Sequence, residues 1–345
     1  MISPWPTPHI DPEAPLQFVI NAASGSNAAE AKRQLIEDAL AAVKRPGILL
    51  FASPANLAQV ARQAVNLAMA RRSAVVAVGG DGTINTVAQA AHASCCPMGV
   101  IPQGTFNYFA RTHGMTDEPE IIAQQLLEWS PWPVQVAAIN ERVFLVNASL
   151  GLYPDLLEDR EAYKARFGRS RWVAFWAACA TLLGAQRRLN MRIEQEGVVR
   201  NVRALTLFVG NNRLQMEQIG VPQPPALPNT PGYITAVMLR PVATLDMLRL
   251  MLHGAMGTLG TAEDIEHFSF DHLVVRPTLI PGRRSVKVAF DGEVTRLRAP
   301  LHFQALPKPL FLLKPAPPTA ASSNTSSNTS SNTAGAETPP ESPDA

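Results

Sequence analysis

Short apolar runs alternate with longer amphipathic stretches through the first hundred residues of this chain. The apolar runs that predict strands cover 16–20, 47–51, 74–78 and 98–101. Between these runs, apolar side chains recur at helical spacing over 28–43, 55–71 and 83–91. Such alternation predicts an α/β domain with a parallel sheet, helices on both faces and ligands at the carboxyl ends of the strands.

After residue 132 the pattern changes to closely spaced runs of strand type. These runs cover 134–139, 143–148, 191–194, 204–209, 233–239, 273–275, 286–290 and 301–305. Two helices are expected among them, over 172–185 and 244–257, and a proline-rich loop is expected over 221–231. A second, β-rich domain that forms a sandwich follows from this pattern.

The two ends of the chain lack a pattern of either kind. Residues 315–345 repeat Ser-Ser-Asn-Thr three times and then turn to Pro, Glu and Asp, so too few apolar side chains are present to offset the entropy of ordering. We expect a disordered, low-complexity tail there. Residues 1–14 are rich in proline and carry no basic segment followed by an apolar core, which predicts a flexible lead-in rather than a secretory signal.

The length and composition narrow the class of protein. A chain of 345 residues exceeds what one hydrophobic core usually organises, and 46% hydrophobic with 17% charged residues is typical of soluble globular proteins. A net charge of +2 argues against nucleic acid as a partner. Two of the three cysteines, Cys95 and Cys96, are adjacent, which excludes a disulfide framework or an ordinary metal-ligand set and favours a reduced, cytoplasmic setting.

The apolar segment 172–185 leaves two interpretations open. Its 14 residues fall short of the ~20 needed to cross a bilayer. Basic residues flank it on both sides: Lys164, Arg166, Arg169 and Arg171 before it, and Arg187 and Arg188 after it. The segment is either a helix that meets lipid headgroups at a membrane surface or a buried helix of the second domain.

Three glycines and one carboxylate stand where the third strand turns into a helix. Gly79, Gly80 and Gly82 permit backbone angles that other residues avoid, and the helix that begins near Thr83 directs its amides and the positive end of its dipole outward. This turn predicts a phosphate site. A carboxylate such as Asp81 is repelled there unless it holds a metal ion, accepts a proton from an attacking hydroxyl, or does both.

Two further polar loops, 21–27 and 102–107, follow the first and fourth strands. The carboxyl ends of parallel strands meet at one edge of a sheet, so we expect all three loops to converge on one crevice. Four motifs then stand in order along the chain: NAASG at 21–25, VGGDGTIN at 78–85, IPQGTFNYFAR at 101–111 and FDGE at 290–293.

With these motifs the chain resembles the diacylglycerol kinase catalytic-domain family, which includes bacterial soluble lipid kinases and the ceramide and sphingosine kinases. The resemblance runs from about residue 16 to 315. It implies a Rossmann-like nucleotide-binding α/β domain over 15–133, completed by 301–314, and a β-rich lipid-substrate domain over 134–300. It also implies an ATP-dependent, magnesium-requiring lipid kinase that phosphorylates the hydroxyl of diacylglycerol or a related lipid alcohol. Further expectations are a lipid substrate at a membrane surface, peripheral contact with the inner membrane, and a homodimer.

The resemblance also assigns residues to the site. Asp81 and Asp291 are the candidate catalytic carboxylates, and Asp81 is the candidate ligand of the metal. The nucleotide and its supporting network are expected on Asn21, Ser24, Gly25, Gly79, Gly80, Gly82, Thr83, Asn85, Gly104, Thr105, Asn107 and Glu293. We favour Asp291 as the general base with Asp81 as its metal-linked partner, although either carboxylate could serve as the base.

Other interpretations remain open at this stage. Asp291-Gly292 is a common hairpin signal, and Ser24-Gly25 also suits a helix N-cap. NAD kinases share the GGDG turn alone, so an NAD kinase-like enzyme is an alternative, as is a non-catalytic nucleotide- or lipid-binding regulatory protein. Thr86 and Tyr108 stand where the family usually has acidic residues, and Pro231-Gly232 where bacterial members often have the Asp-Gly pair of a structural metal site.

Overall fold

The computed structural model describes residues 5–22, 26–104, 106–116, 118–151, 154, 189–211, 216, 232–241, 265–279 and 281–315. All of them belong to one compact unit, Met1–Pro315. The expected helices 172–185 and 244–257, the loop 221–231 and the tail beyond 315 lie outside the described residues, as do Ser24, Gly25 and Thr105.

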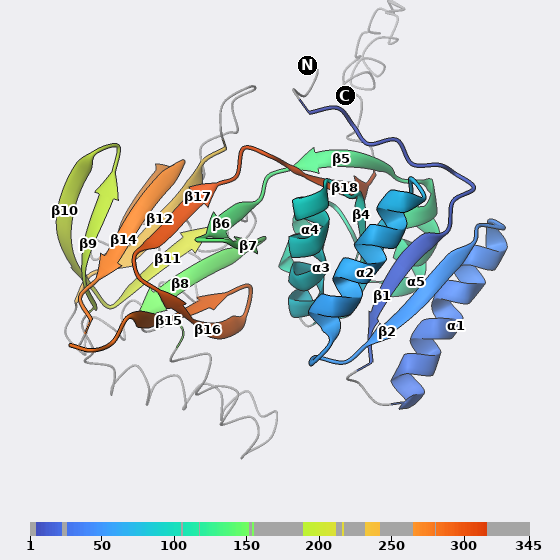
Figure 1. Ribbon diagram of the computed structural model, residues 1–345, viewed down its shortest axis with the longest axis horizontal. Coiled ribbons are helices and arrows are strands. Elements are labelled where there is room, and N and C mark those ends of the chain that lie inside the picture. The colour runs from blue at the N-terminus through green and yellow to red at the C-terminus, as the bar shows by residue number, and fades with distance from the viewer. Residues whose placement is uncertain are drawn as a thin grey trace, which may run out of the picture. The chain divides into compact units, whose positions relative to one another are not determined.

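The first part of the chain, together with β18 from near residue 310, forms a mixed six-stranded sheet of order β2-β1-β3-β4-β18-β5 (Figure 1). Its strands are β1 (Leu16–Asn21), β2 (Gly47–Ala52), β3 (Val75–Gly79), β4 (Met98–Pro102), β5 (Ser130–Val134) and β18 (Leu310–Lys314). All neighbours pair in parallel except β5, which runs antiparallel to β18. Every residue of β3 is buried, as expected for a central strand with both faces covered.

Helices cover this sheet on both faces. They are α1 (Ser26–Ala42), α2 (Leu57–Ala70), α3 (Asp81–Ser94), α4 (Tyr108–Thr112) and α5 (Pro119–Gln125), followed by the 3-10 turn η1 (Leu126–Glu128). The connection from β1 to β2 runs along the sheet in the opposite direction from that between β2 and β3, so right-handed crossovers place α1 and α2 on opposite faces. Accordingly, α2 packs on α3 and β1, whereas α1 packs on α5.

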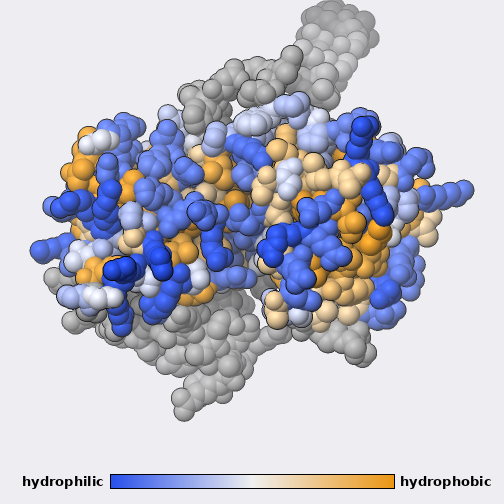
Figure 2. Space-filling view, in the orientation of Figure 1, coloured by the Kyte–Doolittle hydropathy of each residue, from blue (hydrophilic) through white to orange (hydrophobic). Residues whose placement is uncertain are grey.

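Alanine lets α2 approach the sheet closely. Its buried face consists of Leu57, Ala61, Ala64, Val65 and Ala68, which recur at helical spacing. In the space-filling view, the α/β part of the molecule shows an apolar area on its surface, bordered by hydrophilic residues (Figure 2). Among the described helices, none combines the length and the apolar character that a bilayer crossing requires.

The rest of the chain forms two antiparallel six-stranded sheets, β10-β9-β14-β17-β6-β7 and β13-β12-β11-β8-β15-β16. Their bounds are β6 (Ala137–Ile139), β7 (Arg142–Phe144), β8 (Asn147–Gly151), β9 (Leu189–Gln195), β10 (Val198–Ala204), β11 (Thr206–Gly210), β12 (Ile234–Leu239), β13 (Ile265–Phe270), β14 (His272–Pro277), β15 (Ser285–Phe290), β16 (Glu293–Arg298) and β17 (Leu301–Ala305). One core cluster draws on both sheets, for example Ile193 with Leu207, so the sheets pack face to face.

The predicted fold class, a Rossmann-like α/β part with a β-rich sandwich, is confirmed. Its details differ in places. The expected strand 134–139 is divided between β5 and β6, and β10 and β16 were not predicted because their polar residues alternate weakly with apolar ones. The segment 301–314 contributes to two sheets, since β17 pairs with β6 and β14 while β18 pairs with β4 and β5.

The lead-in expected over 1–14 makes specific contacts where the structure describes it. The backbone N–H of Asp11 donates to the carbonyl of Arg72 at 2.8 Å. Trp5 Nε1 donates to the carbonyl of Pro307 at 3.1 Å. The first bond ties residue 11 to the turn after α2, and the second ties residue 5 to the link between β17 and β18.

Candidate active site

The strand order reverses direction between β1 and β3, which is where α/β sheets open a crevice for ligands. A hydrogen bond crosses this point: Asn21 Nδ2, at the end of β1, donates to Thr83 Oγ1 in the first turn of α3, at 3.1 Å. Lys32 of α1 donates from Nζ to the carbonyl of Asn21 at 2.9 Å. Burial lowers the pKa of Lys32. A cation therefore stands beside the predicted phosphate turn, and the sequence had not singled it out.

The turn from β3 into α3 is shaped by its glycines. Gly80 is the N-cap of α3, and no side chain caps the helix. A Cβ added to Gly79 would lie 2.8 Å from Thr83 Oγ1, which is closer than real Cβ atoms approach. The turn therefore requires glycine at 79 for packing, and it leaves the N-terminus of a 14-residue helix open to an anion.

The loop after β4 lies directly against this turn. A Cβ on Gly104 would lie 3.2 Å from Gly80 Cα and 2.8 Å from Asn107 Oδ1. The N–H of Gly104 donates to that same Asn107 oxygen at 2.9 Å, and Asn107 adopts a left-handed conformation with φ 49°. The N–H of Gln103 donates to the Gly79 carbonyl at 2.8 Å. Two backbone turns thus meet with no side chain between them.

Asp81 occupies the first position of α3, beside these turns. Burial raises the pKa of its carboxyl, and a hydrogen bond from the backbone of Asn107 opposes that rise. Its Oδ1 atom is buried and accepts no hydrogen bond from any residue that the structure describes. A buried carboxylate oxygen without a donor is unfavourable by itself, so this atom is suited to a cation or a proton that arrives with a ligand.

Asp291 and Gly292 form the two-residue turn of the hairpin between β15 and β16. Their φ values, 45° and 85°, are those of a type I′ turn, so the hairpin interpretation of this motif is right for the backbone. The side chain of Asp291 nevertheless points inward and is only 6% exposed. The same two residues thus make a turn and place a buried carboxylate.

Four donors surround the Asp291 carboxylate. Oδ2 accepts from Asn85 Nδ2 at 2.6 Å and from the N–H of Leu145 at 2.7 Å. Oδ1 accepts from the N–H groups of Val146 and Asn147 at 2.8 and 3.0 Å. Burial raises the pKa of Asp291 to about 6, against the opposing effect of these hydrogen bonds. At neutral pH the group is therefore an ionised carboxylate.

Asn85 connects this carboxylate to the phosphate turn. It lies one turn into α3 and is buried, and it donates both to Asp291 and to the carbonyl of Val143, at 3.0 Å. Glu293, two residues beyond Asp291, reaches the same helix, because a Cβ on Gly82 would overlap its Oε1. The structure thus brings Asn85 together with Asp291, and Gly82 together with Glu293.

Thr86 and Tyr108, which stand where the family usually has acidic residues, both make local contacts. Thr86 Oγ1 donates to the carbonyl of Gly82 at 2.9 Å, within α3. Tyr108 stacks on Phe106, with ring centroids 5.7 Å apart and planes 8° from parallel. Each replacement therefore makes a contact of its own.

The described donors near the phosphate turn do not form a metal cage, but they suit a metal that is bound together with a nucleotide. Among the described residues, no group of three or more His, Cys, Asp or Glu side chains could hold an ion. Mg²⁺ commonly binds through one or two carboxylates together with the phosphates of a nucleotide, and it does not need such a cage. The orphaned Asp81 oxygen fits that mode.

Comparisons with known proteins agree with this geometry. The family model of the diacylglycerol kinase catalytic domain matches residues 15–139. A probable lipid kinase of YegS-like type from Pseudomonas putida is 28% identical over 71% of this chain and 78% of its own length. A diacylglycerol kinase of Mycobacterium tuberculosis is 29% identical over 51% of this chain and 58% of its own.

The fold has solved counterparts as well. A diacylglycerol kinase from Bacillus anthracis str. Sterne superposes with a TM-score of 0.61 over 88% of this chain and 97% of that one, at 17% identity. At this identity the likeness concerns the fold. The lipid-kinase relatives and the conjunction of the glycine turns with Asp81 agree with the family model: residues 15–139 match the diacylglycerol kinase catalytic domain.

Proposed function

We propose that this protein is an ATP-dependent lipid kinase that transfers the γ-phosphate of ATP to the hydroxyl of diacylglycerol or a related lipid alcohol. The observation that carries the proposal is the convergence of the β1, β3 and β4 turns at the switch point of the sheet, with an orphaned carboxylate oxygen on Asp81 beside them. Phosphoryl transfer needs little covalent work from a protein and much positioning of charge, and these turns can supply it.

In this proposal the phosphates lie on the backbone of Gly79–Thr83 at the open end of α3. Gly104 and Asn107 form the opposite wall, where the close backbone approach of Gly80 and Gly104 keeps side chains out of the way. Lys32 adds positive charge at the end of β1. Asp81 would hold Mg²⁺, which neutralises phosphate charge when bound and aligns the phosphates for attack.

Asp291 is proposed as the general base. Its pKa of about 6 suits a group that must be ionised at neutral pH and still accept a proton. Both of its oxygens already accept two donors, so the acceptor hydroxyl needs a state in which one of those donors has moved away. In a largely dissociative transition state the proton is accepted late, so Asp291 need not take the proton before the phosphoryl group begins to leave ATP.

The decisive experiment is a transfer assay with labelled ATP and magnesium. Total lipid extract in mixed micelles and, separately, NAD serve as acceptors, and the labelled product is identified by mass. A labelled lipid monophosphate supports the proposal. Labelled NADP would establish the NAD kinase alternative, and nucleotide binding without any transfer would favour a regulatory protein.

Variants separate the two carboxylates. Asp291→Asn is expected to keep nucleotide affinity while turnover falls by at least ~10²-fold, the usual scale of a lost general base. Asp81→Ala is expected to weaken magnesium-dependent ATP binding as well. Asp38→Asn, on the exposed side of α1, is the matched control and should behave as wild type. Normal turnover of Asp291→Asn would refute the base assignment.

A further inference from the structure

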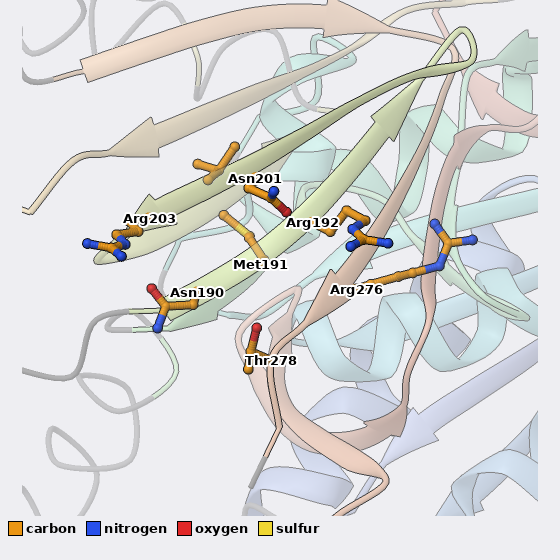
Figure 3. A pocket seen from close by; sticks show the side chains of 8 residues that line it. Asn190, Met191, Arg192, Asn201, Arg203, Arg276 and Thr278 are labelled. Atoms are coloured by element: carbon orange, nitrogen blue, oxygen red, sulfur yellow. The ribbon is translucent and has the colours of Figure 1, made fainter.

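A second candidate site lies away from the catalytic carboxylates, on the β10–β9–β14 edge of one sandwich sheet. It is a cavity of about 540 Å³. Its polar lining consists of Asn190, Arg192, Asn201, Arg203, Arg276 and Thr278 (Figure 3). Neither Asp81 nor Asp291 contributes to it, and none of the described residues that line it is acidic.

Strand register explains why these side chains gather. Arg192 of β9 pairs with Asn201 of β10 on one side and with Arg276 of β14 on the other. Directly paired residues share a face of a sheet, so all three belong to the same face. Arg203, two residues beyond Asn201, lies on that face as well, opposite Asn190.

The charge of this face is unbalanced. Arg276 donates to Glu194 at 2.6 Å, an ion pair between side chains that are 45% and 38% exposed. Within the part of the chain that the structure describes, Arg192 and Arg203 make no ion pair and no side-chain hydrogen bond. Figure 3 shows Arg192 beside Arg276 on the adjacent strand, with Arg203 at the other end of the cavity. The arrangement offers guanidinium groups to more than one anion.

Two apolar side chains extend from the same hairpin. Val198 and Val199 follow the turn between β9 and β10, and they are 63% and 52% exposed. Val199 pairs with Glu194 and therefore shares the face of Arg192 and Arg203. Exposed valines next to arginines are suited to the boundary between lipid headgroups and acyl chains.

We propose that this face and the tip of the β9–β10 hairpin dock on an anionic phospholipid bilayer, with Arg192, Arg203 and Arg276 binding headgroup phosphates. Val199, on the same face, and Val198, on the other side of the hairpin tip, would enter the interface. Charge complementarity favours an anionic surface, and the two valines favour a bilayer over a soluble polyanion. The proposal rests on the proposed function in one respect: a lipid acceptor is found in a bilayer, which the protein must reach. The surface would then hold the kinase where its substrate is.

The test measures binding of the full-length protein to vesicles by sedimentation, without ATP. Vesicles of phosphatidylglycerol and phosphatidylcholine are compared with vesicles of phosphatidylcholine alone. We expect binding to the anionic vesicles that weakens with added salt. The double variant Arg192→Gln and Arg203→Gln should bind roughly 30-fold more weakly, since each arginine near an anionic surface contributes about a factor of five.

Matched variants guard against a general charge effect. Arg62→Gln with Arg71→Gln removes the same charge from α2 and its C-cap, and it should bind as wild type. Val198→Ser with Val199→Ser should also weaken binding to the anionic vesicles. Equal binding to both kinds of vesicle, an equal loss in the α2 control, or no effect of the valine changes would overturn the proposal.

Soluble competitors and turnover complete the design. If inorganic phosphate released the protein from vesicles more strongly than chloride does at equal ionic strength, the site would be one for small anions and bilayer docking would be overturned. Binding of duplex DNA that depends on Arg192 and Arg203 would overturn bilayer docking as well. The arginine double variant should phosphorylate a short-chain, water-soluble diacylglycerol at the wild-type rate. If no lipid is ever phosphorylated while vesicle binding stays arginine-dependent, the proposed function fails and the docking surface stands.

Discussion

Replacing Asp291 by asparagine tests the balance between burial and hydrogen bonding at the hairpin turn. Burial raises the pKa of this carboxyl from 3.8 to about 6 in the folded protein. A group whose pKa is higher in the folded than in the unfolded state contributes stability fully below the unfolded pKa. That contribution is lost as the pH rises through the folded pKa, because the unfolded chain gives up its proton more easily.

The magnitude follows from the size of the shift. Each unit corresponds to about 1.36 kcal/mol, so a rise of about 2 units corresponds to about 3 kcal/mol, lost between roughly pH 4 and 7. The Asp291→Asn variant has no such titration. In wild type, Asn85 and Leu145 both donate to Oδ2 of Asp291. An asparagine side chain has only one oxygen, so its NH₂ group leaves donors without an acceptor, and each unpaired donor lowers the free energy of unfolding by on the order of 1–3 kcal/mol, independent of pH.

The assay is urea unfolding of wild type and Asp291→Asn, followed by circular dichroism at several pH values from about 4 to 8. The wild type's advantage in free energy of unfolding should shrink by about 3 kcal/mol across this range. Asp38→Asn, at an exposed position, provides the baseline. If the advantage grew with pH instead, the four donors would outweigh burial and the reasoning would be refuted.

Three further changes probe the nucleotide crevice. Asp81→Asn keeps the shape of the side chain but removes its charge, so the magnesium dependence of ATP binding should weaken sharply in calorimetry; an unchanged dependence would exclude Asp81 as a metal ligand. Gly104→Ala forces a methyl group to 3.2 Å from Gly80 Cα and should raise the KM for ATP by about 10-fold or more with secondary structure intact. Lys32→Met should weaken ATP binding by about 10-fold, on the scale of a lost charge-assisted hydrogen bond, whereas Lys44→Met, just beyond α1, should not.

The parallel sheet could be predicted because its strands are buried on both faces. The run 74–78 has no polar residue to interrupt it, and the bounds of β3 differ from the predicted bounds by one residue at each end. Strands of the sandwich were harder to predict. In β10, Asn201 and Arg203 lie on the outward face of the sheet. The inward face carries Arg200, whose guanidinium donates a hydrogen bond to Glu266 at 2.8 Å. An arginine on the inward side breaks the alternation that would mark a strand.

Contacts of the candidate site that involve glycines or carboxylates could be predicted from the sequence. Contacts made by backbone N–H groups could not. The turns containing Gly80 and Gly104 were expected to meet, and they do. No sequence pattern marks the N–H groups of Leu145–Asn147 as partners of Asp291, because every residue except proline has such a group and only the fold directs it. Lys32 was missed for a related reason: its position on α1 faces Asn21 only once the crossover is built.

The four hydrogen bonds to Asp291 also indicate which contact must open if it is to accept a proton. Three of the donors are consecutive backbone amides, which cannot leave without moving the chain between β7 and β8. The fourth is the side-chain amide of Asn85, which can rotate away at the expense of its bonds to Asp291 and to the Val143 carbonyl. Asn85 belongs to the helix whose first turn is proposed to hold the phosphates. We therefore expect nucleotide binding at α3 to influence the availability of the base through Asn85, and Asn85→Ala to uncouple the two by freeing one acceptor position permanently.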